Sequence, residues 1–190
     1  MSSTSAPFGM RPSFHPSGLD RAVALPNGIA SAYGTGILKG QPVALNTSGN
    51  IIAATAGSAY QGAFAGHEFT DTTGRRLVSN QWVASTAYQT GSCVAYFYND
   101  ANIVYEIQAD GIVNQSAIGD EANFTNLTAG STTTGLSALM LDTATLTDSG
   151  NAQLRIIGLS PAPDNDFGDS FTIVQVQVSE HQNVADRAAY

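Results

Sequence analysis

Residues 170–178, SFTIVQVQV, decide the fold class of this chain. Apolar or β-branched residues recur at every second position from Thr172 to Val178, and Gln175 and Gln177 stand between them. A period of two is the period of a β-strand, because successive side chains of a strand point to opposite faces. The segment therefore predicts a strand with one face in a core and one largely polar face.

Further strand-length segments, separated by turn residues, extend outward from this one. QLRIIGL at 153–159 predicts a second strand, and PAPDNDFGD between the two predicts a loop. SCVAYFYND and ANIVYEIQAD predict a hairpin that turns at Asn99–Asp100. From Ser31 onward, short apolar segments separated by glycine predict a meander. We find no heptad, long amphipathic helix or fixed-period repeat in the sequence.

Length and composition favour the same class. The chain has 190 residues, of which 43% are hydrophobic, so it is long enough to build a core. Only 12% of the residues are charged, which is well below the usual globular share and suits sheet surfaces and turns better than solvated helices. We expect an all-β protein: a single compact β-barrel or jelly-roll-like sandwich domain over residues 21–180, an extended N-terminal arm over 1–20 and a C-terminal tail over 181–190.

The arm is predicted from its prolines and its spaced apolar residues. Three prolines within residues 1–20 oppose both a helix and a central strand. Phe8, Met10 and Phe14 nevertheless need an apolar surface to pack on. An extended arm that lies on a neighbouring surface meets both conditions. A disordered tail is the alternative, although disordered segments usually lack such aromatic residues.

Two other segments show less alternation. Residues 68–90 predict a long surface loop, which is either a contact loop or an ordinary loop around a packed Trp82. In residues 130–142, GSTTTGLSALMLD, the threonines favour extended backbone, Gly135 permits a kink, and 136–141 has the apolar content of a strand. We interpret this second segment as a glycine-hinged strand rather than a ligand loop.

Charge and cysteine content exclude several classes of partner. The formal net charge is -8, and the seven basic residues are scattered except for the adjacent Arg75 and Arg76, so we expect no nucleic acid partner. The lone Cys93 cannot form an intrachain disulfide, and its strand-like surroundings suit a buried apolar residue. Because neither a secretory signal pattern nor a membrane-spanning apolar run is present, we expect synthesis in a cytoplasm and no membrane partner.

Patterns typical of catalysis or metal binding are missing from the sequence. The glycines are flanked by strands or turns, whereas a nucleotide site needs a glycine-rich loop that joins a strand to a helix. The three histidines are far apart, and no HExxH, CxxC or GxSxG motif occurs. DNDFGD at 164–169 offers oxygen ligands to calcium but lacks EF-hand spacing, so a plain turn is favoured. A catalytic triad or carboxylate pair assembled in space stays open. We expect no enzyme, no cofactor and no metal.

Several segments, in order, resemble a known family. They are APFGMRPSFHPSG at 6–18, EIQADG at 106–111, GSTTTGLSALMLD at 130–142, LRIIGL at 154–159 with PDN at 163–165, and VSEHQ at 178–182. Together they resemble small virion structural proteins of tailed bacteriophages, the capsid decoration or cement proteins encoded among head genes. The resemblance covers most of the chain and is best over residues 94–182, whereas residues 68–90 match no pattern of the family.

The resemblance implies a β-rich protein without enzymatic activity on the outer surface of the virion capsid, made in the cytoplasm of the host bacterium. Its partners would be the major capsid protein and further copies of itself, as a dimer or trimer on a symmetry axis of the shell. There it would bridge capsid subunits and stabilise the assembled head. The candidate capsid contacts are Phe8, Met10, Arg11, Phe14, Arg75, Arg76 and Trp82.

Two other functions compete with this expectation. A head-fibre or receptor- and glycan-binding virion module would use aromatic side chains on β-loops, with Trp82 and Tyr88 as its contacts. A hydrolase assembled in space ranks last, because no sequence motif supports it.

Overall fold

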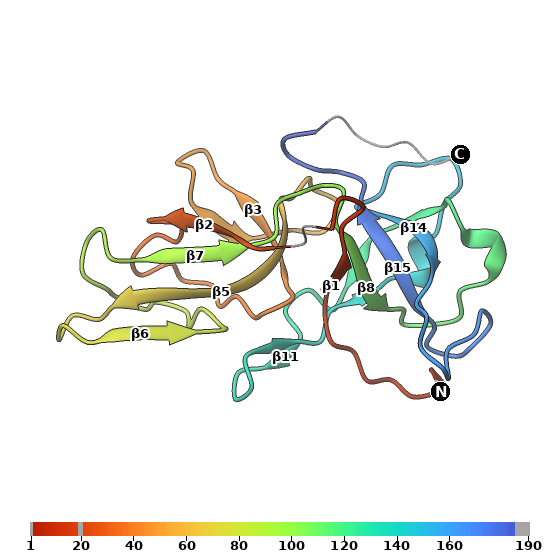
Figure 1. The fold of residues 1–190 in the computed structure, drawn as a ribbon, viewed down its shortest axis with the longest axis horizontal. Helices are drawn as coiled ribbons and strands as arrows, with labels where there is room; N and C mark the ends of the chain where they lie inside the picture. Colours follow the sequence, from red (N-terminus) through yellow and green to blue (C-terminus); the bar gives the residue numbers. More distant parts are fainter. Residues whose placement is uncertain (1, 19–20, 185–190) are drawn as a thin grey trace.

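The computed structural model describes residues 2–18 and 21–184 (Figure 1). This part of the chain consists of antiparallel strands, two short 3-10 turns and connecting loops, with no α-helix. Within the same ranges, no helix has the length and apolar character to cross a membrane. The all-β prediction is confirmed. Residues 1, 19 and 20 of the predicted arm and 185–190 of the predicted tail lie outside the described residues.

One sheet has five strands and occupies the right half of Figure 1. In spatial order its strands are β1 (Arg11–Phe14), β8 (Val104–Gln108), β15 (Ile173–Val178), β14 (Leu154–Leu159) and β9 (Glu121–Ala122). The strands predicted at 153–159 and 170–178 are thus confirmed as the β14–β15 pair, in which Leu154 lies opposite Val178. The alternating residues of β15 bury Val174, Val176 and Val178, as the period of two predicts.

The second sheet occupies the left half of Figure 1. In order, its strands are β2 (Val23–Pro26), β7 (Val94–Phe97), β5 (Gly62–Thr70), β3 (Pro42–Leu45) and β4 (Ile51–Ala53). A sixth strand, β6 (Arg76–Ser79), pairs with the outer end of β5 over residues 67–70. β5 is therefore the central strand of this sheet and runs along most of its length.

Two hydrophobic clusters fill the molecule. One packs against the five-stranded sheet and includes Met10, Tyr60 and Tyr105. The other packs against the six-stranded sheet and includes Phe64 and Trp82. Two sheets with separate clusters are consistent with a β-sandwich and do not confirm a single barrel.

The segment 130–142 does not form one strand. β11 (Gly130–Ser131) pairs with β12 (Leu136–Ser137), and β13 (Met140–Leu141) pairs with β10 (Phe124–Thr125). Residues 132–135 form the turn of the first pair, in which 132–134 are exposed and Gly135 is buried. Gly135 has a φ of +71°, a left-handed conformation that suits glycine. The threonines thus lie in a hairpin turn, and the predicted strand at 136–141 is wrong. Short 3-10 turns at Gln115–Ala117 and Thr143–Thr145 complete the fold.

The predicted hairpin around Asn99–Asp100 is also wrong. β7 pairs with β2 and β5, whereas β8 pairs with β1 and β15, so the turn carries the chain from one sheet to the other. All five residues of β8 are buried, because the core covers one face and the N-terminal segment with residues 160–170 covers the other. Strand patterns alone do not reveal which neighbour a strand pairs with.

Residues 68–90 do not form the predicted surface loop. Glu68 and its neighbours complete β5, β6 follows after a tight turn at Asp71–Arg75, and Trp82 is buried against Ile37 through a backbone bridge. The alternative that the sequence left open, a packed Trp82, is the one observed.

The N-terminal segment Ser2–Phe14 lies on the protein's own surface. The Ser2 N–H donates to the Asp164 carbonyl at 2.8 Å, and the Ala6 N–H donates to the Gln108 side chain at 2.8 Å. The segment then forms β1 and pairs with β8. It has the extended conformation predicted for an arm, but in this chain it is an edge strand of the five-stranded sheet rather than a free arm.

Candidate functional site

A groove lies where the N-terminal segment passes between the two sheets. Its cavity has a volume of about 340 Å³ and a mostly apolar wall. Met10 and Phe64 form part of its buried floor, and Phe8, Tyr98 and Leu136 contribute further apolar surface. We call this cavity the junction groove. Its volume falls within the range of small ligand sites.

Two glycines set the shape of this groove. The Met10 N–H donates to the Gly40 carbonyl at 2.8 Å, so the two backbones are in close contact. Gly9 and Gly40 have φ values of +74° and +81°, and a Cβ at Gly9 would lie 2.8 Å from the Gly40 carbonyl oxygen. Any larger residue at position 9 would force the N-terminal segment away from the Gly40 turn, because both conformation and space favour glycine there.

Arg11 forms part of the groove wall and is already paired. Its Nε lies 3.1 Å from Oε2 of the buried Glu106, its Nη2 contacts the same oxygen, and its guanidinium lies 4.6 Å from the centre of the Phe8 ring. Burial raises the pKa of Glu106, but hydrogen bonds from Arg11, Ser160 and Ser13 more than offset this, so the pKa lies below its ordinary value. Arg11 therefore stabilises a buried carboxylate within the protein.

Lys39 is the second cation of the groove and, unlike Arg11, has no carboxylate partner among the described residues. It is exposed at the groove, and no carboxylate in residues 2–18 and 21–184 forms a salt bridge with it. A backbone bridge holds it beside Leu136, since the Lys39 N–H donates to the Gly135 carbonyl and the Ser137 N–H donates to the Lys39 carbonyl. The groove thus combines an apolar cavity with two exposed cations, of which only Arg11 is paired with a carboxylate among the described residues.

A second candidate surface lies at the outer end of the six-stranded sheet. β6 pairs only with β5 among the described strands, so its other side is an open sheet edge. Val78 is 77% exposed, and Val83, shortly after the strand, is 59% exposed. We call the four residues of β6 the β6 edge. Exposed apolar residues on an unpaired edge are uncommon in isolated proteins and typical of interaction sites.

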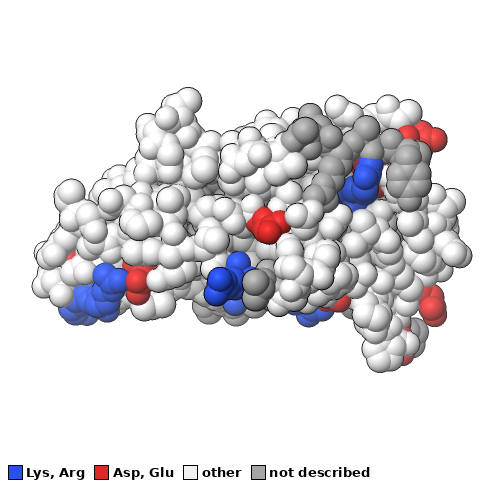
Figure 2. Space-filling view, turned by 45° about the horizontal axis from the view of Figure 1, so that its top comes forward, with Lys and Arg blue, Asp and Glu red and all other residues white. Residues whose placement is uncertain are grey.

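The arginines at the β6 edge are paired within the protein. Arg75 Nε lies 3.0 Å from Asp71 Oδ2, and Arg76 Nη2 lies 2.6 Å from Glu68 Oε1. Figure 2 shows basic and acidic groups side by side at this end of the molecule, while most of the visible surface carries no charged side chain. The edge is thus apolar with locally neutralised charges.

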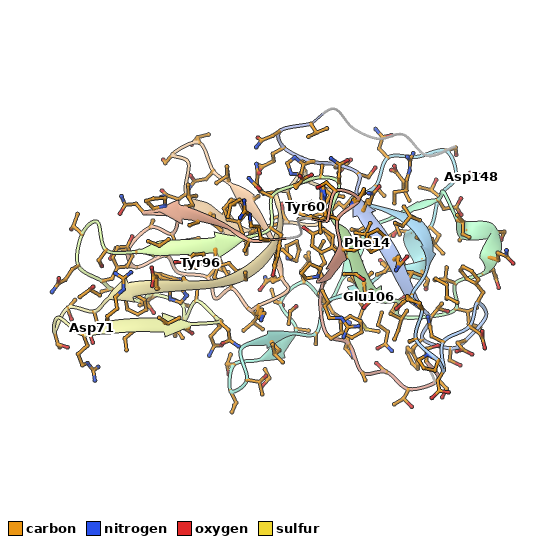
Figure 3. All side chains as sticks on the ribbon, in the orientation of Figure 1. Phe14, Tyr60, Asp71, Tyr96, Glu106 and Asp148 are labelled. Carbon is orange, nitrogen blue, oxygen red and sulfur yellow. The ribbon has the colours of Figure 1, made fainter. Side chains whose placement is uncertain are left out.

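The predicted contact residues fall in different places. Phe8 and Arg11 lie at the junction groove, and Arg75 and Arg76 lie at the β6 edge. Phe14 is 44% exposed on β1. Figure 3 shows Phe14 near Glu106 in the right half of the molecule and Asp71 at the opposite tip. The structure therefore does not gather these residues into one site.

Two predicted contacts are corrected. Met10 and Trp82 are buried in the two cores, so neither is the exposed contact that the sequence predicts, and Met10 only borders the floor of the junction groove. The Trp82 indole donates to the Tyr33 carbonyl at 3.1 Å, and the Tyr88 hydroxyl donates to the Ile29 carbonyl. The glycan-binding alternative thereby loses Trp82 as a stacking surface, and the polar end of Tyr88 is engaged within the protein.

Sequence reasoning missed Lys39, Leu136, Leu77 and Val78. The last two directly follow the arginine pair in a strand pattern of four residues, and recognition of the β5–β6 hairpin would have placed them on an edge. Lys39 and Leu136 are far apart in the sequence, and no local pattern indicates that they meet.

The DNDFGD turn holds the N-terminal segment. Asn165 uses its side chain to bind the backbone of Ser160 and Ile173, and Asp169 accepts from the Ser2 hydroxyl and the Asp166 N–H. The hydrogen bond from Ser2 is the main reason that the pKa of Asp169 is lowered. Across the described ranges, no group of three or more His, Cys, Asp or Glu side chains is placed to hold a metal ion.

Comparison of this chain with protein-family models, curated proteins and solved structures found no match.

Proposed function

We propose that this chain is a capsid decoration or cement protein of a tailed bacteriophage. It would bind the outer surface of the assembled head, bridge major capsid protein subunits and stabilise the shell, without enzymatic activity. The proposal rests on the sequence resemblance together with one structural observation, the exposed apolar β6 edge. Several segments that carry the resemblance lie in β8, β14 and β15, which form the buried scaffold of the five-stranded sheet. They support membership in a fold family rather than a contact surface.

The β6 edge is the observation that favours adhesion over catalysis. Val78 is 77% exposed on a strand that pairs with β5 on one side only. Covering its apolar side chain with a partner surface lowers the free energy, because that surface leaves water. The neighbouring Arg75 and Arg76 are neutralised by Asp71 and Glu68, so a partner can cover the edge without meeting unpaired charges from them. Such an edge suits another protein surface.

The mechanism of stabilisation would be mass action. A protein that binds only the assembled lattice lowers the free energy of that lattice relative to its dissociated or unexpanded forms. If each copy touches two subunits, or if copies form a dimer or trimer, the second contact forms at a high effective concentration. Individually weak contacts at an edge of four residues then suffice for high occupancy.

A single charge at the edge tests this function. Val78→Asp places a carboxylate at an exposed position, so the fold and melting temperature should be preserved, while binding to heads should fall at least tenfold. Heads purified without the protein would be incubated with wild-type or variant protein, and bound copies would be counted after sedimentation. Cryo-electron microscopy of the decorated particle would locate the contact.

Ile112→Asp is the matched control. Ile112 is 54% exposed but lies in the loop after β8, in the half of the molecule that holds the five-stranded sheet. This variant should bind heads as the wild type does. If heads do not bind the wild-type protein at all, the cement proposal is wrong. If Val78→Asp and Ile112→Asp bind equally well, the β6 edge is not the contact.

A further inference from the structure

We propose that the junction groove binds a peptide segment of a partner protein in which a bulky apolar side chain stands beside a carboxylate. This inference does not depend on the partner being a capsid protein. It rests on the shape of the cavity, on the chemistry of its wall and on the charge at its rim.

The cavity selects an apolar side chain. Its volume of about 340 Å³ accommodates an aromatic or large aliphatic group, and its floor contains the buried side chains of Met10 and Phe64. Leu136 at its wall is 48% exposed. A side chain that enters the groove removes this apolar surface from water, which is favourable in proportion to the area covered.

The rim selects a negative charge. Both cations at the groove are exposed, but Arg11 is bound to Glu106 and packed over Phe8, whereas Lys39 forms no salt bridge with the described residues. The chain as a whole is acidic, with a net charge of -8, so the positive charge of Lys39 beside the cavity differs from the overall charge of the protein. A carboxylate next to the inserted side chain would lie within reach of its ammonium group.

The backbone around the groove is held in place. The contact between Gly9 and Gly40 fixes the N-terminal segment to the Lys39–Gly40 turn, and the hydrogen bonds of Lys39 fix the β12 hairpin to the same turn. The Gly40 N–H also donates to the Phe64 carbonyl at 2.8 Å, which ties the turn to β5. The site is therefore largely formed before a partner arrives, which lowers the entropic cost of binding.

Matched blocked dipeptides test this chemistry. N-acetyl-Phe-Glu-amide carries both features, N-acetyl-Phe-Gln-amide lacks the charge, and N-acetyl-Gly-Glu-amide lacks the apolar side chain. Nuclear magnetic resonance titrations of the full chain would give their dissociation constants. We expect millimolar binding of the first, about threefold weaker binding of the second, and no saturable binding of the third. Resonances of Phe8, Lys39 and Leu136 should shift.

Two variants complete the test. Lys39→Gln should reduce the preference for the charged dipeptide to less than about 1.5-fold, while binding of the neutral one is unchanged. Leu136→Trp should fill the cavity and abolish binding of both the charged and the neutral dipeptide. Ile112→Asp, outside the groove, should leave both affinities unaltered, and the spectrum of the buried core should confirm that each variant is folded. No saturable shift at the groove, or an undiminished charge preference in Lys39→Gln, would overturn the proposal.

Discussion

His67 shows how one residue ties the stability of the protein to pH. It is 2% exposed on β5, stacks on Phe69 with ring centres 5.2 Å apart and an interplanar angle of 6°, and meets the edge of Trp82 at 5.2 Å. Its Nδ1 has no hydrogen-bond partner among the described residues. Burial lowers the pKa of His67 to about 4, because the charged form would lose its hydration in this aromatic cluster.

This shift predicts a loss of stability in mild acid. Between pH 6.5 and 4 the unfolded chain binds a proton at this histidine and the folded chain does not, so the free energy of unfolding should fall as pH falls through that window. The full loss should be about 3 kcal/mol, and above pH 6.5 the effect should be absent. Urea unfolding at several pH values measures it.

His67→Phe is the diagnostic variant. Phenylalanine keeps an aromatic ring in the stack and cannot be protonated, so the variant should lack this part of the pH dependence. Nearby Tyr88 and Cys93 have pKa values raised by burial and stay neutral throughout the window. Contributions from carboxylates elsewhere are common to both proteins and cancel in the difference. Parallel stability curves for wild type and variant would show that His67 is not the cause.

At the scale of the element, β1 is an integral part of the five-stranded sheet rather than a free arm. It covers the edge of β8, its neighbour Met10 is buried in the core, and its Arg11 holds the buried Glu106. Deletion of residues 2–14 removes all three contributions and exposes a new sheet edge. We expect the melting temperature to drop by about 10 °C or more, because loss of a buried methionine alone costs about 2–5 kcal/mol of stability. Because a sheet edge is newly exposed, we also expect aggregates in size-exclusion chromatography.

Phe14→Ser provides the matched control, because Phe14 lies in the same strand but is 44% exposed. Its melting temperature should stay within about 2 °C of the wild type, as is usual for exposed positions. A truncated chain that remains monomeric with an unchanged melting temperature would mean that residues 2–14 are dispensable for the fold. The free arm would then be the better description.

The elements also show what local pattern can and cannot predict. β15 was predictable because its apolar residues alternate, and β14 was predictable because a strand-length apolar segment adjoins the same turn-rich loop. The strands that pair with β8 were not predictable from local pattern. In the sequence β7 and β8 look like the two arms of a hairpin, although they belong to different sheets. Strand pairing is decided by which faces are covered in the folded molecule, and that information is spread over the whole chain.

The two candidate surfaces could not be predicted from local sequence patterns either, because they also depend on contacts between distant parts of the chain. The sequence of residues 68–90 predicts a loop, because β6 has only four residues and its apolar pair faces solvent rather than a core. The junction groove depends on contacts between the N-terminal segment, the Gly40 turn and the β12 hairpin, which are distant in sequence. Sequence alone indicated Phe8 and Arg11 but not the cavity that they border.

At the scale of the whole molecule, the position of the two surfaces suits a bridging protein. β5 runs from the junction groove at Phe64 to the β6 edge at Thr70, so one strand connects both surfaces. A partner bound at the groove and another bound at the edge would contact different parts of the same chain. This arrangement supports the proposal that the protein joins neighbouring subunits, because bridging needs two separate contacts.

The net charge of the protein predicts how its occupancy on heads depends on salt concentration. Each copy carries a formal charge of -8, so copies held close together on a shell repel one another. The proposed contact at the β6 edge is apolar, and its arginines are neutralised by Asp71 and Glu68, so it should be insensitive to salt. Salt screens the repulsion between copies, since the Debye length is about 10 Å at 0.1 M. Occupancy on heads should therefore be constant or should rise between about 0.05 and about 0.5 M NaCl.

Sedimentation of decorated heads over this salt range measures the occupancy. Arg75→Gln and Arg76→Gln, which remove paired charges at the edge, should not change the direction of the salt effect. An occupancy that falls steeply with added salt would show instead that attraction between unlike charges dominates the contact. The arginines of the 68–90 segment, rather than Leu77 and Val78, would then be the residues that hold the protein on the shell.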